Sequence, residues 1–153
     1  MEQLQEIYCH YTEALQAAKK AASPLAGIFG TGGGINQHPC HQEFYDQVGK
    51  WTERFLADDP DAEAVEEVAR FILVAGGAHK NLPTYWFVCA AQAHAKPMLG
   101  MLSRECCEQL RQEYDSLYPA SNRLPLTQEI YEALCKGAGV KPQKKGFFSF
   151  WKK

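Results

Sequence analysis

The spacing of apolar residues and prolines most strongly constrains the fold of this chain. From the N-terminus to about residue 137, apolar side chains recur every three or four residues, the period that places them on one face of an α-helix. Seven of the eight prolines fall at or close to the boundaries of these periodic segments. No run alternates apolar and polar residues with the period of a strand. The two signals together predict an all-α bundle of five or six mostly antiparallel helices.

The N-terminal half predicts two long helices joined by a long connection. The first helix should end before Pro24, because the residue preceding a proline avoids the α conformation. A glycine-rich loop of residues 24–37 follows, and its length is unusual for a compact domain. The second helix should begin with His38 near the cap and Pro39 as its first helical residue, where the missing N–H costs nothing. A third helix is expected with Asp59 as its N-cap and Pro60 as its first residue.

The C-terminal half predicts a central buried helix and two more amphipathic helices. Residues 84–95 (TYWFVCAAQAHA) are apolar nearly all round. Pro97 is expected to kink or end this helix and to open the next one, with Leu99 and Leu102 on its apolar face. Tyr118-Pro119 should stop that helix. A short last helix is expected to finish just before Gly137.

Length and charge suggest one domain followed by a short tail. A chain of 153 residues is long enough to bury a sizeable core in a single domain. Residues 1–137 contain eleven basic and eighteen acidic side chains, a net charge of −7, whereas residues 138–153 carry five lysines and no acid. We therefore expect a helical domain over 1–137 and a basic-aromatic tail over 138–153. The acidic body argues against nucleic-acid binding, which needs clustered lysine and arginine.

The N-terminal sequence predicts a cytoplasmic location. It has neither the positive start nor the apolar stretch of a secretory signal, and no apolar run is long enough to span a bilayer. The six cysteines should then be reduced, and most of them buried as small apolar residues.

The cluster His38-Pro39-Cys40-His41 is the strongest candidate for chemistry. A cysteine in the first turn of a helix can be stabilised as a thiolate by the helix dipole, and His38 or His41 could act as a base or lower the thiol pKa. The simpler alternative is that His38 caps the helix and Cys40 packs as an inert core thiol. Two of these residues, completed by His79 or His94, could also hold zinc. No paired-cysteine or paired-histidine motif accompanies them, however, and we expect no cofactor.

Two further features are candidates for binding. The run Gly32, Gly33 and Gly34 could meet an anion or close over a site, but it lacks the lysine and spacing of a phosphate-binding loop, so a plain connection is the alternative. His94, on the most apolar helix, belongs either to a pocket or to the core as a neutral hydrogen-bonded histidine.

The C-terminal tail is the most distinctive segment after the cluster of residues 38–41. Its four aromatic residues, Phe147, Phe148, Phe150 and Trp151, lie within five positions and are flanked by lysine pairs. Such a segment could insert rings at a lipid interface while the lysines meet anionic headgroups. It could equally bind a protein partner, dock on its own body or mediate a dimer, since exposed aromatic clusters are unusual on a monomer.

Two functions from different classes follow. The favoured one is a non-catalytic helical module that binds a partner, a second copy or the inner membrane surface through the tail. The alternative is a thiol- or metal-dependent enzyme or sensor centred on Cys40 with His38 and His41.

Overall fold

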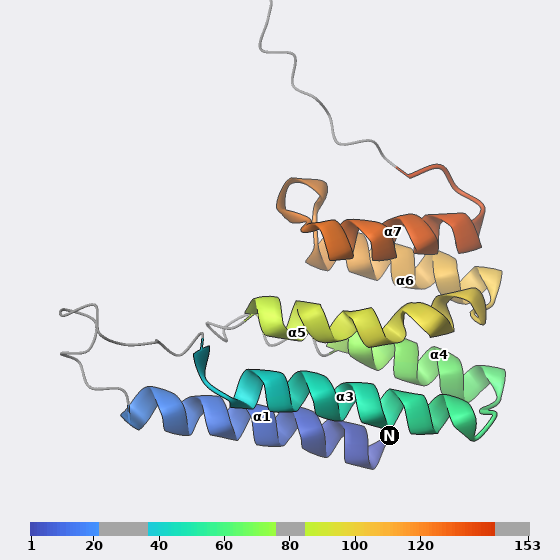
Figure 1. Ribbon diagram of the computed structural model, residues 1–153. Coiled ribbons are helices and arrows are strands. Elements are labelled where there is room, and N and C mark those ends of the chain that lie inside the picture. Colours follow the sequence, from blue (N-terminus) through green and yellow to red (C-terminus); the bar gives the residue numbers. More distant parts are fainter. Residues whose placement is uncertain (22–36, 76–84, 143–153) are drawn as a thin grey trace, which may run out of the picture.

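The computed structural model describes residues 1–21, 37–75 and 85–142 (Figure 1). Within these ranges the chain forms six α-helices and no strand, which confirms the predicted all-α bundle. Among the described residues, no helix is both long and apolar enough to cross a lipid bilayer.

The helices stack as three neighbouring antiparallel pairs (Figure 1). The first pair is α1 (Glu2–Ala21) with α3 (Cys40–Ala57), and the third is α6 (Arg104–Leu117) with α7 (Pro125–Ala138). In the second pair, α4 (Ala62–Arg70) packs against the C-terminal continuation of α5 (Tyr85–Ala91). Two of these helices change pitch at their C-terminal ends. Helix α4 continues as the π-helical turn η2 (Phe71–Ala75), and α5 continues as the 3₁₀ helix η4 (Gln92–Gly100).

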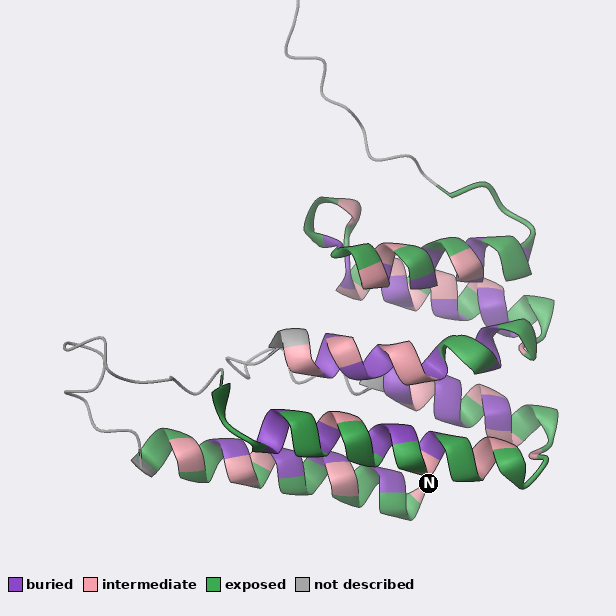
Figure 2. Ribbon diagram, in the orientation of Figure 1, coloured by how far each residue is buried: buried purple, intermediate pink, exposed green. Residues whose placement is uncertain are grey.

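One hydrophobic core runs through all three pairs (Figure 2). Helix α1 shows how the sequence builds it: Leu4, Tyr8, Tyr11 and Leu15 recur every three or four residues, and all four are buried. Five of the six cysteines are buried in the same way and only Cys9 is exposed, so the predicted burial of most thiols is confirmed.

The predicted start of the third helix is wrong by two residues. Asp61, not Asp59, is the N-cap of α4, because its backbone is extended and its carboxylate accepts a hydrogen bond of 2.8 Å from the Ala64 N–H. Asp59 instead has a φ of 51°, a left-handed conformation in which it turns the chain between α3 and α4.

Pro97 does not end its helix. It lies inside η4, and the helical path continues to Gly100. The next helix starts at Arg104 with Ser103 as its N-cap, whose hydroxyl accepts from the Cys106 N–H. Leu99 and Leu102 therefore precede α6 rather than forming its first apolar positions, which corrects the prediction.

The last helix ends two residues later than predicted. Gly139, with a φ of 73°, is the left-handed C-cap of α7, and its N–H bonds back to the carbonyls of Cys135 and Lys136. Gly137 lies within α7, at a point where α6 packs closely against it. A Cβ on Gly137 would be 2.4 Å from the Cys107 sulfur.

Candidate functional site at the start of helix α3

The histidine-cysteine cluster forms the entrance to α3. The Cys40 N–H donates to Nδ1 of His38 at 3.3 Å, and the His41 N–H donates to the His38 carbonyl at 3.2 Å. His38 therefore satisfies two of the amide groups that a helix leaves unpaired at its N-terminus. The N-cap itself is Pro39 and α3 begins at Cys40, so the predicted start at Pro39 is one residue early, and His38 makes these bonds from the position before the cap.

His41 is held between α1 and α5. Its Nδ1 and the Tyr11 hydroxyl share a buried hydrogen bond of 2.9 Å. Its ring stacks on Phe87 with centroids 3.6 Å apart and planes 1° from parallel. The side chain is only 5% exposed. His41 thus joins three helices, and both its ring plane and one ring nitrogen are fixed by these contacts.

A cleft of about 420 Å³ opens beside these residues, where α3 and α5 begin. Phe87, Ala90 and Pro39 supply apolar surface, and amide, imidazole and phenol groups supply polar surface. Its volume is within the range of small-molecule sites. The full lining is Gln37, His38, Pro39, His41, Gln42, Tyr45, Phe87 and Ala90.

Cys40 does not face this cleft. Its side chain is buried and lines a separate hollow of about 150 Å³ between α1 and α3, with Ile7 and Ala14 among its neighbours. Burial raises the pKa of the Cys40 thiol, and the carboxylate of Glu43 raises it further, more than the backbone lowers it. A reactive thiolate needs the opposite shift, so the geometry gives no support to a nucleophile at Cys40.

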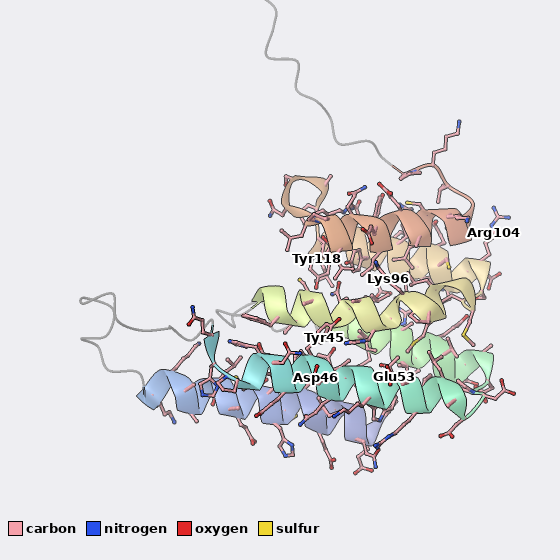
Figure 3. The ribbon with its side chains drawn as sticks, in the orientation of Figure 1. Tyr45, Asp46, Glu53, Lys96, Arg104 and Tyr118 are labelled. Carbon is pink, nitrogen blue, oxygen red and sulfur yellow. The ribbon has the colours of Figure 1, made fainter. Side chains whose placement is uncertain are left out.

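His94 follows the cleft residue Ala90 by one helical turn, and it packs against α3 rather than lining the cleft. Its ring contacts that of Tyr45, which is labelled in Figure 3, with centroids 4.3 Å apart. It also fits against Gly49, where a Cβ would be 2.7 Å from Cε1. Its Nε2 is buried and has no hydrogen-bond partner among the described residues. Burial lowers the pKa of His94, although the backbone of Tyr45 and the carboxylates of Glu53 and Asp46 oppose that shift.

The structure therefore separates the four candidate residues that it describes. His38 and His41 share the cleft, whereas Cys40 turns toward α1 and His94 packs behind Tyr45. Over the described ranges, no three histidine, cysteine or acidic side chains lie close enough together to hold a metal ion.

Sequence reasoning missed Tyr45, Gln42 and Phe87 as cleft residues. Tyr45 follows His41 by four positions, so it lies on the same side of α3, and this spacing was available in the sequence. Phe87 reaches the cleft only through the packing of α5 on α3, which no local pattern reports.

The remaining candidates lie outside the described residues. They are Gly32, Gly33 and Gly34 in the glycine loop, the zinc candidate His79, and Phe147, Phe148, Phe150 and Trp151 in the tail.

No protein-family model, curated protein or solved structure matches the chain.

Proposed function

We propose that this protein is a non-catalytic helical module that binds an anionic membrane surface through its basic-aromatic tail, residues 138–153. The observation that carries the proposal is the composition of the tail, with four aromatic residues in five positions between the lysine pairs 144–145 and 152–153. Phenylalanine and tryptophan rings partition into the interfacial region of a bilayer. Lysines near an anionic surface add about 1 kcal/mol each.

The end of α7 supports this role for the tail. The left-handed cap at Gly139 terminates the helix, and Val140, Lys141 and Pro142 are exposed. The buried core of the described residues extends no further than Ala138. The body thus has a packed core up to the point at which the tail begins.

The arrangement of charge favours a lipid surface over a specific protein pocket. Lysines lie on both sides of the aromatic residues, so the rings can enter the interface while every ammonium group stays at headgroup level. A body with a net charge of −7 is repelled by anionic lipid. Binding through one short segment should therefore be reversible and sensitive to salt.

The test is co-sedimentation with vesicles of phosphatidylcholine alone or mixed with phosphatidylserine. The full chain should pellet with the mixed vesicles at low salt, and much less with phosphatidylcholine or at high salt. Removal of residues 143–153 should abolish pelleting while leaving the circular dichroism spectrum of the body unchanged.

Two tail variants separate the contribution of the aromatic rings to vesicle binding from that of the lysines. Serine in place of the four aromatic residues should remove binding, and glutamine in place of Lys144, Lys145, Lys152 and Lys153 should remove the preference for phosphatidylserine. Equal pelleting of the full and truncated chains would exclude the tail as the membrane contact. A tail-dependent dimer in sedimentation velocity, without vesicle binding, would replace the lipid with a second copy.

A further inference from the structure

A further hollow lies between η4 and α7 and shares no lining residue with the α3–α5 cleft. It is a groove of about 560 Å³. Leu99, Leu102, Ile130 and Ala133 give it an apolar floor, and a glycine from each helix widens it at one end. Three charged side chains border it: Lys96, Glu129 and Lys136.

The dimensions of the groove suit one chain of medium length. Glu129 and Lys136 mark its two ends along α7, and seven residues of helix span about 10 Å. The volume is typical of sites that enclose a small molecule rather than of a protein interface, which is flatter and larger. The occupant that fits is an unbranched apolar chain.

The charges at the two ends of the groove differ. At one end the Lys96 ammonium donates to the Glu129 carboxylate at 2.5 Å, so these two charges offset each other (Figure 3 labels Lys96). At the other end Lys136 forms no ion pair with any described residue. Glu132, one turn before it, is hydrogen-bonded to Gln128 and does not line the groove. The charged side chains that line the groove therefore sum to +1, and Lys136 is the one without an ion pair among the described residues.

We propose that this groove binds a single-chain amphiphile with a carboxylate head, such as a medium-chain fatty acid. The chain lies over Leu99, Leu102, Ile130 and Ala133, and the carboxylate meets the ammonium group of Lys136. This site does not depend on the membrane role of the tail, because all of its residues belong to the described body.

The chain's own tail is a less suitable occupant. It begins near this end of α7 and has the apolar rings to fill a groove, but it also carries four lysines around those rings. They would be brought close to Lys136, and like charges at short range are unfavourable. The experiment below distinguishes the two occupants.

The test is titration of the full chain with sodium decanoate below its micelle concentration, followed by amide NMR and calorimetry. Shifts should concentrate at residues 99–102 and 130–137. Decyltrimethylammonium, which has the same chain length and the opposite charge, should bind at least fivefold more weakly. Equal binding of the two probes, or shifts centred elsewhere, would overturn the proposal.

Two substitutions sharpen the test because they act in opposite directions, and a third is their control. Lys136→Gln should weaken decanoate binding about fivefold, the upper end of what one ion pair at an exposed lysine contributes. Glu129→Gln leaves Lys96 unpaired and should strengthen binding by a similar factor. Lys50→Gln, on the far side of the body in α3, is the matched control and should change nothing.

Filling the groove and removing the tail complete the experiment. Ala133→Phe should abolish decanoate binding without lowering the melting temperature, since Ala133 is only half-buried. Deletion of residues 143–153 should leave the decanoate affinity unchanged. Binding that appears only after this deletion would assign the groove to the tail and refute the amphiphile. Because decanoate is measured without vesicles, failure here leaves the membrane proposal standing, and the converse holds as well.

Discussion

Individual residues in this bundle are set by how closely neighbouring helices approach. Gly49 is the clearest case, since the ring of His94 occupies the space that a side chain would take. His94 in turn leaves its Nε2 buried without a partner among the described residues. The identity of one residue is thus explained only by a second residue 45 positions away in the sequence.

Replacing Gly49 with alanine should lower the free energy of unfolding by roughly 1–3 kcal/mol, because the new Cβ overlaps the imidazole of His94. Urea denaturation measures the change. Gly100→Ala is the matched control, since a Cβ there meets nothing within 4 Å. The cost should shrink in a His94→Ala background, where the obstructing ring is absent; an equal cost in both backgrounds would contradict this explanation.

Thiol reactivity should follow burial. Cys9 is the exposed cysteine, and burial raises the pKa of Cys40, of Cys107 and of Cys106, the last to about 11. In the folded protein at neutral pH, an alkylating agent should label Cys9 first and the buried thiols only slowly. Mass spectrometry of a timed series measures the order. Labelling of Cys40 before Cys9 would restore the thiol-enzyme hypothesis.

The pH dependence of stability should contain a contribution from His94. Its folded-state pKa lies below the ordinary value of about 6.5, so the unfolded chain binds this proton at a higher pH than the folded one. Stability from this group is fully present above pH 6.5 and is lost as the pH falls through the folded pKa. Urea titrations at several pH values measure how steeply the free energy of unfolding depends on pH. This dependence should be weaker in His94→Asn and unchanged in His10→Asn, which alters an exposed histidine.

At the scale of elements, buried polar side chains fix how helices meet. Gln92, fully buried, donates to the Leu73 carbonyl at 3.3 Å and to the Tyr118 hydroxyl at 2.8 Å, and it accepts from the Tyr114 hydroxyl at 2.7 Å. One amide thus links η2, η4 and the end of α6. Such a network specifies a single packing, because any shift leaves buried groups unpaired.

The turn between α6 and α7 depends on Arg123. Its guanidinium pairs with Asp115, donates to the Tyr118 carbonyl at 2.8 Å and lies 3.5 Å above the Tyr131 ring. Arg123→Lys keeps the charge but loses the planar fork, and should cost roughly 1–3 kcal/mol of stability by leaving either the Tyr118 carbonyl or the half-exposed Asp115 carboxylate unpaired. Arg70→Lys, in the half-exposed pair with Glu113, should cost under about 1 kcal/mol. Thermal denaturation measures both losses of stability. An equal loss in Arg123→Lys and Arg70→Lys would show that the guanidinium fork of Arg123 is unimportant.

At the scale of the whole molecule, the α3–α5 cleft and the η4–α7 groove are separate features of the described body, and the chain adds one distinctive tail. The α3–α5 cleft and the η4–α7 groove are formed by different helices. Because they share no lining residue, a substitution in one can serve as a control for the other. The tail follows the cap at Gly139 and can be removed without cutting a described helix.

The sequence alone determined the class of fold and most of the helices. The three-to-four-residue period and the prolines predicted the all-α bundle, since both act locally: periodicity defines one face, and a proline limits the backbone at its own position. The errors of the sequence prediction lie at helix boundaries, where neighbouring residues are equally suitable as caps. Asp59 and Asp61 are both good N-caps, and only the chain direction imposed by α3 and α4 decided between them.

Tertiary structure decided the site. That Cys40 turns toward α1, that His41 stacks on Phe87 and that His94 requires Gly49 all depend on which helices lie side by side. The groove beside Lys136 likewise exists only because η4 runs past Pro97 to meet α7. The physical reason is range: helix formation is set within a few residues, whereas burial, pKa shifts and cavities arise between segments that are distant in the sequence.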